Sequence, residues 1–345
     1  MRKFAWLICL FLTIGLLVGC SEKKVDNKPT KKPDKVVDPK VEEPKFKNQF
    51  PLSGVPTNED VNGRAVAVMI SNAPEARPQT GLNKADVVFE YYAESNITRF
   101  LALYQSEKPE KMGPVRSARE YYVRTAKIYD AFYVAHGYSE PARKLLQSGF
   151  LDNINGMVYE GTYFHREKGR VAPHNSYTSF GDIEKAAEKL KKSLIGPPKA
   201  YKFYEEKELA TIQGNAANEV TIKYGGSEFD VTYKFNTSTG KYTRWVKGAQ
   251  WADKESGAPI EIENIFITEM KTTVPIPADK LKVIDIQSGG KAYLLQKGKM
   301  TECTWENRDG AIRPMLNGVE LKLVPGHTWI SSIPTGNLIK IVTVK

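Results

Sequence analysis

The spacing of hydrophobic residues changes once along this chain of 345 residues, near residue 200. Before that point, short apolar runs rich in β-branched and aromatic residues are typical of buried strands. Two stretches with apolar residues on one face instead indicate helices, each beginning at a serine suited to the N-cap position. The pattern predicts strands at 64–72, 86–93, 97–105 and 130–137, and helices at 139–148 and 179–194.

After residue 200 the apolar and polar residues alternate, and Gly, Asn-Gly and Pro interrupt the runs. This spacing is typical of antiparallel strands and hairpins, and we find no helical pattern beyond Glu208. The motif at 195–199 (IGPPK) would end the preceding helix and mark a domain boundary. The sequence therefore predicts an α+β protein, with a mixed α/β domain at 50–197 followed by a β-rich, mostly antiparallel domain at 198–345.

The N-terminus carries a targeting signal. Residues 1–19 join a short basic start to an apolar run and end in LVG before Cys20, which resembles the lipobox of bacterial lipoproteins. Residues 20–49 mix Lys, Asp, Glu and Pro and predict a disordered tether behind the lipidated cysteine. We expect a protein held on the extracytoplasmic face of the cell membrane by acyl chains on Cys20.

Cysteine and charge narrow the chemistry further. Once Cys9 leaves with the signal and Cys20 carries lipid, only Cys303 remains, so no internal disulfide can form. Cys303 lies in a predicted strand with no basic neighbour, which favours a structural role. The net charge of +10 falls to about +5 without the signal and tether. No nucleic-acid motif accompanies that modest charge, so no nucleic-acid partner is predicted.

The stretch GPVRSAREYYVRTAK (113–127) concentrates cations. If a helix begins at Pro114, its first turns would bring Arg116, Ser117 and Arg119 to the positive end of the helix dipole, where an anion could bind. The alternative is a solvated face, or arginines paired with Glu90 or Glu94 of the same chain. Arg99, inside an apolar strand, must face a polar cleft or an internal ion pair.

A second polar segment, 163–179 (YFHREKGRVAPHNSYTS), has little periodicity and reads as a long loop. His165 and His174 lie nine residues apart, which matches no zinc spacing, and no metal or cofactor is predicted. His174 could act as a general base, but no complete catalytic motif surrounds it. The candidate ligand-binding residues from both segments are Arg99, Arg116, Ser117, Arg119, Arg166, His174 and Asn175.

Several motifs together resemble the YerB-like lipoproteins, a family with a two-part domain of unknown function behind a lipobox. The resemblance runs from about residue 50 to the C-terminus and is carried by ARPQTGL, ADVVFEYYAESNITRFLALY, GPVRSAREYY, HREKGRVAPHNSYTS and PGHTWISSIP. It implies a membrane-anchored envelope lipoprotein with an α/β part and a β-rich part. The family brings no known reaction, ligand or catalytic residue, and the AHGYSE segment departs from the family's more glycine-rich form, which leaves His136 a doubtful site residue.

Three hypotheses for function follow. The leading one is a non-catalytic lipoprotein that presents the arginines and His174 to an anionic envelope ligand or a partner protein. The second is an enzyme acting on a phosphorylated or glycan envelope substrate, with His174 as acid and base. The third is a scaffold of a membrane complex that uses its β-rich half as the contact surface.

Overall fold

The computed structural model describes residues 46–275 and 281–345. The contacts of the chain divide it into two units, Met1–Pro44 and Lys45–Lys345, and the second contains every element described below. The predicted signal peptide, the lipidation site Cys20 and most of the predicted tether lie outside the described residues. The last residues of that tether, Asn48–Gln49, form a short strand, β1, paired with β2 (Pro56–Thr57).

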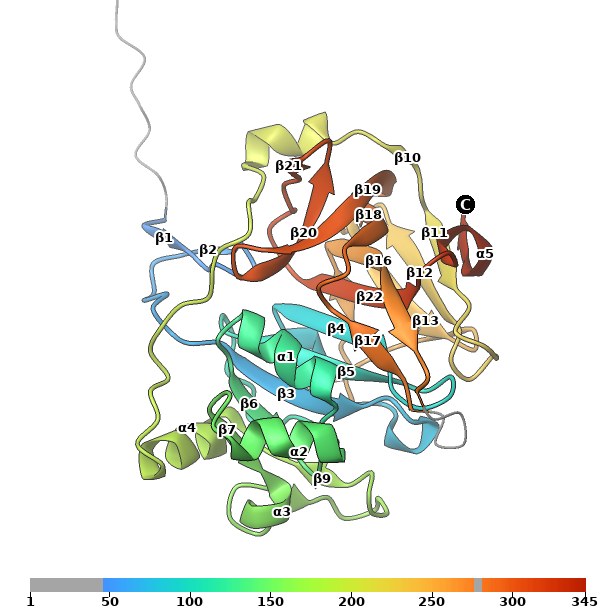
Figure 1. Ribbon diagram of the computed structural model, residues 1–345. Helices are drawn as coiled ribbons and strands as arrows, with labels where there is room; N and C mark the ends of the chain where they lie inside the picture. Colours follow the sequence, from blue (N-terminus) through green and yellow to red (C-terminus); the bar gives the residue numbers. More distant parts are fainter. Residues whose placement is uncertain (1–45, 276–280) are drawn as a thin grey trace, which may run out of the picture. The chain divides into compact units, whose positions relative to one another are not determined.

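A large mixed sheet occupies the centre of Lys45–Lys345 (Figure 1). Within the described ranges its strand order is β21-β20-β19-β18-β16-β22-β4-β5-β3-β6-β7, and in addition β10 pairs with β19 and β17 pairs with β16. The N-terminal strands are β3 (Val66–Ser71), β4 (Val87–Tyr92), β5 (Thr98–Tyr104), β6 (Phe132–Ala135) and β7 (Asn153–Asn155). The later strands are β10 (Asn215–Ala216), β16 (Asn264–Thr273), β17 (Val283–Asp285), β18 (Gly290–Gln296), β19 (Lys299–Arg308), β20 (Ala311–Leu316), β21 (Val319–Glu320) and β22 (Thr328–Pro334).

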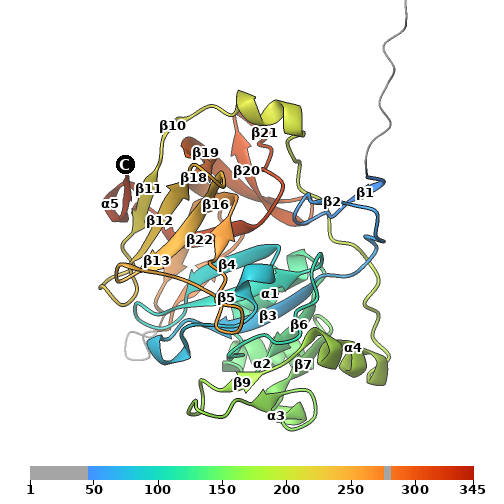
Figure 2. The same cartoon turned by 180° about the vertical axis from the view of Figure 1, so that it is seen from behind.

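The two faces of β4 pack against different layers, because successive side chains of a strand point to opposite faces. Tyr91 stacks on Tyr122 of helix α1 (Glu120–Ile128), whereas Glu90 contacts Arg244 of strand β13. Strand β13 belongs to a second, antiparallel sheet of β11 (Glu219–Ile222), β12 (Val231–Asn236), β13 (Lys241–Val246), β14 (Ala249–Gln250), β15 (Glu261–Ile262) and β23 (Val342–Val344). Figures 1 and 2 show this sheet on the side of β4 and β5 opposite α1.

The remaining elements are short. They are α2 (Glu140–Gln147), α3 (Gly156–Tyr159), α4 (Phe180–Lys189), α5 (Leu338–Ile341), the hairpin of β8 (His165–Arg166) and β9 (Ser176–Tyr177), and the 3-10 turns Pro74–Ala76, Leu82–Lys84 and Glu206–Thr211. Helix α4 begins as predicted, because the Ser179 hydroxyl accepts a hydrogen bond from the Asp182 N–H. No helix in the described part of the chain is long and apolar enough to cross a membrane.

The predicted α+β class is confirmed, since the strands are mostly antiparallel and the N-terminal region is mixed. Every predicted strand before residue 140 is present, with bounds within a few residues of the expected ones. Helix α5 lies in the half where no helix was expected. The large sheet crosses the proposed boundary, because β22 pairs with β4 as well as with β16. The division at residue 197 therefore stays a prediction.

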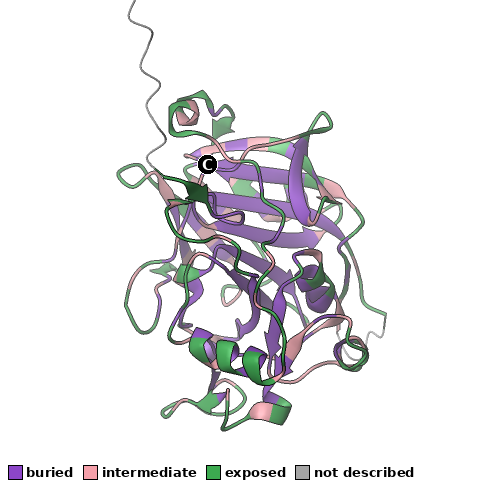
Figure 3. Cartoon of the chain, turned by 90° about the vertical axis from the view of Figure 1, so that its left-hand side faces the viewer, coloured by how far each residue is buried: buried purple, intermediate pink, exposed green. Residues whose placement is uncertain are grey.

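The core is built from strand residues, and Figure 3 shows the buried strands beneath exposed loops and helix surfaces. Trp251, Trp305 and Trp329 are all buried, as expected for aromatic residues that fill a core rather than bind sugars. Cys303 is also buried in β19, and burial raises the pKa of its thiol to about 12. A thiol with so high a pKa is a poor nucleophile, in agreement with the predicted structural role.

Candidate functional site

Most of the predicted site residues gather where three parallel strands end. Strands β3, β6 and β7 run parallel, and residues 115–118 continue the sheet between the ends of β3 and β6. The Arg116 N–H donates to Met69 O at 2.9 Å, and the His136 N–H donates to Arg116 O at 3.0 Å. The carboxyl edge of a parallel sheet is the usual place for ligands in α/β proteins.

This geometry corrects one prediction. The helix expected to begin at Pro114 begins at Glu120, with Arg119 as its N-cap residue. Arg116 and Ser117 precede it in an extended segment, because the backbone of 115–118 is taken up by the sheet. An anion site built on the first turn of a helix by Arg116 and Ser117 is therefore wrong. The arginines converge for a different reason, namely the end of the sheet.

Arg116 lies at the centre of this edge. Its side chain is half-buried, and its guanidinium makes no hydrogen bond or ion pair with any residue in 46–275 or 281–345. Burial lowers its pKa, Glu94 opposes that shift, and Arg119 adds to it. None of its nitrogens is among the buried side-chain atoms that lack a hydrogen-bond partner in the described residues. The N–H donors of Arg116 therefore keep contact with solvent and stay open to an acceptor from outside the chain.

Arg99 and Arg119 share one carboxylate beside Arg116. The Arg99 guanidinium donates to both oxygens of Glu94, at 3.0 and 2.9 Å, and to Ser117 O at 2.7 Å. Arg119 forms an ion pair with the same Glu94. Burial raises the pKa of Glu94, but Arg99, Arg119 and Arg116 lower it by more, so it is held ionised. Three guanidiniums around one carboxylate leave a local excess of two positive charges.

His174 faces the same arginines from the β8–β9 hairpin. Burial lowers its pKa, and Arg116 is the charge that contributes most to that shift, followed by Glu75, which opposes it. The Nδ1 atom of His174 is buried and has no hydrogen-bond partner among the described residues. In the neutral imidazole this nitrogen can accept a hydrogen bond. In the protonated imidazole it can donate one to an anion.

His136, at the end of β6, connects this edge to Arg166. Its Nδ1 lies 2.7 Å from Ser176 Oγ, and its Nε2 lies 3.7 Å from Glu160 Oε2. Arg166 binds Glu160 through Nε at 2.5 Å and Asn175 Oδ1 through Nη1 at 2.8 Å. The pKa of His136 is lowered, first by burial and then by Arg166. His136 was the doubtful site residue, and the structure places it within the electrostatic reach of Arg116.

We call Arg99, Arg116, Arg119, His136 and His174, together with Glu94, the Arg116 cluster. Arg166 and Asn175 are predicted site residues that it does not include, because they bind each other and Asn175 Nδ2 also donates to Arg170 O. The backbone carbonyl of Ser117 accepts a hydrogen bond from Arg99. The Ser117 hydroxyl lies close to Gly137, so that a Cβ added to this glycine would be 2.8 Å from Oγ.

Comparison with known proteins adds the family. Residues 52–193 match the N-terminal domain, and residues 220–330 the C-terminal domain, of a family described as "Protein of unknown function (DUF3048)". The chain belongs to the DUF3048 family. This DUF3048 chain is 39% identical over 343 residues to the protein named "Putative lipoprotein YerB" of Bacillus subtilis strain 168, and the match covers 97% of this chain and 96% of that protein.

A crystal structure of YerB from Bacillus subtilis has the same fold. It aligns with a TM-score of 0.79 at 39% identity and covers 87% of this chain and 100% of that one. The expected membership in the YerB-like family is therefore confirmed. The relative's name supports a lipoprotein, and none of the comparisons assigns a ligand or a reaction to the DUF3048 domains.

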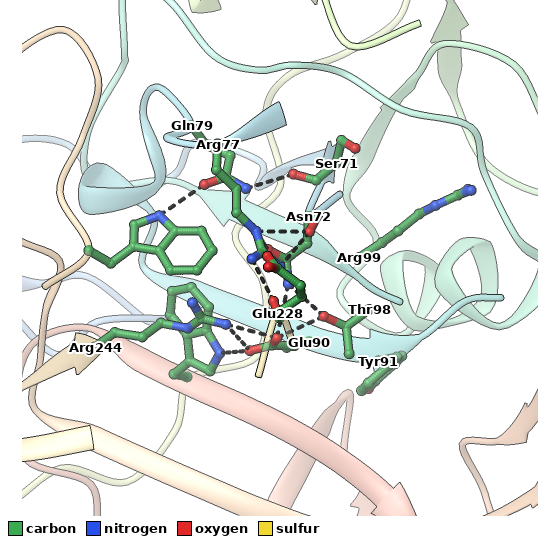
Figure 4. Close-up of polar contacts among 12 residues, drawn as sticks. Ser71, Asn72, Arg77, Gln79, Glu90, Tyr91, Thr98, Arg99, Glu228 and Arg244 are labelled. Atoms are coloured by element: carbon green, nitrogen blue, oxygen red, sulfur yellow. Dashed lines mark hydrogen bonds and ion pairs between the residues drawn. The ribbon is translucent and has the colours of Figure 1, made fainter. Parts of the chain in front are cut away.

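The other acid proposed as a partner for the arginines, Glu90, is engaged elsewhere. It accepts from Arg244, Thr98, Asn72 and Trp329, on the side of β4 away from the Arg116 cluster. Figure 4 shows Arg99 pointing away from this network. Of the two internal partners considered for Arg99 and Arg119, the structure thus selects Glu94 for both.

The chemistry available at the cluster is that of an anion site. Its only serine–histidine contact uses Ser176, which is 1% exposed, so a substrate cannot reach that hydroxyl. No group of three His, Cys, Asp or Glu side chains within 46–275 and 281–345 could hold a metal ion. Arginines and imidazoles can instead give several charge-assisted hydrogen bonds to phosphate or carboxylate oxygens.

Sequence reasoning missed Glu160, Ser176 and Gly156, which support His136. A Cβ on Gly156 would lie 2.3 Å from His136 Nδ1, so the imidazole occupies the space that a larger residue would fill. The signal for this arrangement is weak in the sequence, because His136 follows β6 and Gly156 follows β7, so their contact depends on the pairing of those two strands.

Proposed function

We propose that this DUF3048 protein is a lipoprotein of the cell envelope, anchored through Cys20, that binds an anionic envelope ligand at the Arg116 cluster. The single observation that carries the proposal is the Arg116 guanidinium, half-buried and without a partner among the described residues. Its donors keep contact with solvent beside a local excess of positive charge, so an external anion can reach them.

The surrounding residues favour a phosphate or carboxylate group over a neutral ligand. Glu94 neutralises part of the charge of Arg99 and Arg119 and fixes both side chains, but it leaves the excess positive charge unbalanced. Fixed donors cost less entropy on binding than mobile surface lysines would. The imidazole of His174 lies within the electrostatic field of Arg116, so an anion bound there would favour its protonated form.

A protein partner is the second candidate. The pairing of Arg99 and Arg119 with Glu94 satisfies two of the three arginines internally, which is the outcome expected of a scaffold. An acidic side chain of a partner protein could supply the acceptor for Arg116 by the same chemistry. The enzyme alternative has less support, because Ser176 is buried and no other serine, threonine or cysteine contacts an imidazole in the described residues.

The test is thermal unfolding of residues 45–345 in the presence of phosphate, pyrophosphate, polyprenyl-phosphate mimics, wall-glycan fragments and teichoic-acid fragments. A ligand at a hundred times its dissociation constant should add about 2.7 kcal/mol to the free energy of unfolding. Arg116→Ala should lose the shift. The matched control is Arg143→Ala, since Arg143 is exposed and pairs with Glu140 on α2.

The outcomes separate the alternatives. A shift that disappears in Arg116→Ala but persists in Arg143→Ala identifies the cluster as the site and names the ligand class. A shift that survives Arg116→Ala, or no shift with any anion, would contradict the proposal and direct the search to protein partners.

The anchor needs its own experiment, because Cys20 lies outside the described residues. Cells producing the full chain are supplied with a clickable fatty-acid analogue. Label should enter the wild-type protein and Cys303→Ala, whose thiol is buried, but not Cys20→Ala. Label in Cys20→Ala would refute anchoring at this residue.

A further inference from the structure

An apolar pocket of about 420 Å³ lies between helix α1, strand β17 and the start of α2. Figure 1 shows α1 and β17 side by side. Its apolar lining comprises Tyr121, Pro141, Leu281, Val283, Ile284 and Ile286. The volume lies within the range of small-molecule sites, and Val283 is 47% exposed. The wall of this pocket is therefore accessible to a ligand as the chain stands.

Cations border the pocket on the side of the Arg116 cluster. Arg119 belongs to both the pocket lining and the cluster, and its Nε is buried without an acceptor among the described residues. The Lys282 ammonium lies 4.4 Å from the centroid of the Tyr92 ring and has no ion pair within 46–275 or 281–345. Burial alone lowers the pKa of Lys282.

Backbone contacts place Lys282 beside the cluster. The Lys282 N–H donates to Ala93 O at 3.3 Å, and Leu281 forms a bridge with Glu94, the carboxylate shared by Arg99 and Arg119. The pocket lining also includes Asp285 and the ion pair of Glu120 with Arg124. The excess positive charge next to the pocket therefore comes from Lys282 and the Arg116 cluster. An apolar pocket beside this charge is complementary to an amphiphile with one anionic end, and a free inorganic anion would leave the apolar wall unused.

We propose that this pocket holds the hydrocarbon chain of a lipid phosphate whose head group binds the Arg116 cluster on its Arg119 side, with Lys282 next to it. The inference rests on the proposed function for recognition of the anion and adds the class of ligand. A single chain fits the pocket better than a peptide helix, because a helix is about 10 Å across and needs a longer groove.

The test uses a series of ethyl, butyl, hexyl and octyl phosphates below their micelle concentrations, titrated calorimetrically into residues 45–345. Each methylene that enters the pocket should lower the dissociation constant by up to about fourfold, the equivalent of about 0.8 kcal/mol. Affinity should stop rising once the pocket is full. Equal dissociation constants across the series would overturn the inference while leaving the anion site intact.

Two variants test where the hydrocarbon chain and the phosphate head group bind. Val283→Glu should abolish the dependence on chain length but keep binding of ethyl phosphate; the matched control is Val319→Glu, an exposed valine outside the pocket. Lys282→Gln should weaken every phosphate by a similar factor. If Val283→Glu keeps the full chain-length dependence, the chain binds elsewhere and the inference fails.

The proposed function fails in a different way. If Arg116→Ala binds ethyl phosphate as well as the wild-type protein does, the anion site is wrong, whatever the chain length does. If Arg116→Ala loses ethyl phosphate and the wild-type series shows the expected slope, both proposals are supported.

Discussion

Glu90 of β4 and Arg244 of β13 form an ion pair in which both side chains are completely buried, at 2.9 and 3.1 Å between Arg244 Nη2 and the two carboxylate oxygens. The residues are 154 positions apart, one in each of the halves predicted from the sequence. Arg244 also lies 4.1 Å from the centre of the Trp251 ring. This pair therefore connects the two sheets at the centre of the core.

Replacing one member of the pair should be strongly destabilising. Arg244→Met leaves the Glu90 carboxylate buried without its cation, and removing one partner of a buried pair typically costs about 3–5 kcal/mol of unfolding free energy. Unfolding of residues 45–345 in guanidinium chloride measures this loss of unfolding free energy. Glu120→Gln, which breaks an exposed pair with Arg124, should cost less than about 1 kcal/mol.

The double variant Glu90→Leu, Arg244→Met distinguishes charge from packing. It removes both charges, so it should be less destabilised than Arg244→Met alone. It should not recover fully, because Asn72 and Trp329 would lose the oxygens that accept their N–H groups. If the double variant is less stable than both Glu90→Leu and Arg244→Met, the pair contributes mainly through the packing of its side chains.

Gly156→Ala should displace the His136 imidazole and destabilise the protein. The added Cβ would lie 2.3 Å from His136 Nδ1, so the imidazole must leave Ser176 or the backbone must shift. We expect a loss of about 1–3 kcal/mol in urea unfolding, as for other overpacked positions. Gly181→Ala in α4 meets only Ser179 Oγ at 3.9 Å and should show no loss. Equal stability of the two variants would mean that His136 is not held against Gly156.

The affinity for an anion should depend on pH through His174. In the free protein the pKa of His174 lies below its ordinary value of 6.5, first because of burial and then because of Arg116. A bound anion offsets Arg116 and raises that pKa, so binding takes up a proton. Sulfate keeps the same charge from about pH 7.5 to about pH 5.5, and it should bind more tightly as the pH falls, by at most about tenfold per pH unit for one proton.

The stability of the free protein should move in the opposite direction. Because the pKa of His174 is lowered on folding, the unfolded chain takes up its proton first, and stability falls as the pH drops below 6.5. His174→Gln should reduce both effects, and His165→Gln is the control because His165 is exposed and pairs with Asp182. Sulfate binding that is independent of pH in the wild-type protein would exclude His174 from the site.

The strands could be predicted because their local pattern agrees with their environment. Residues 66–70 are apolar throughout, and β3 is buried on both faces, so pattern and burial coincide. The start of α1 could not be predicted in the same way. Pro114 is compatible with a first helical turn, but the hydrogen bonds from Arg116 to Met69 and from His136 to Arg116 hold this segment in the sheet. Those partners are distant in sequence, and no local propensity reports them.

The candidate site shows the same division. Arg99, Arg116, Arg119 and His174 could be selected from their composition and from the cost of burying them, and the structure brings them together. Which arginine lacks a partner depends on the position of Glu94, which follows from the turn between β4 and β5 and its approach to Arg119. The pocket beside α1 forms because β17, which follows α1 by more than 150 residues in the sequence, packs next to that helix.

The most direct test of anion binding at the Arg116 cluster is a crystal of residues 45–345 soaked in tungstate, a heavy-atom analogue of phosphate. We expect an anomalous peak within hydrogen-bond distance of the Arg116 guanidinium, absent from crystals of Arg116→Ala and present in those of Arg143→Ala. A well-occupied tungstate elsewhere on the protein, with none at Arg116, would contradict the claim that the Arg116 cluster is an anion-binding site.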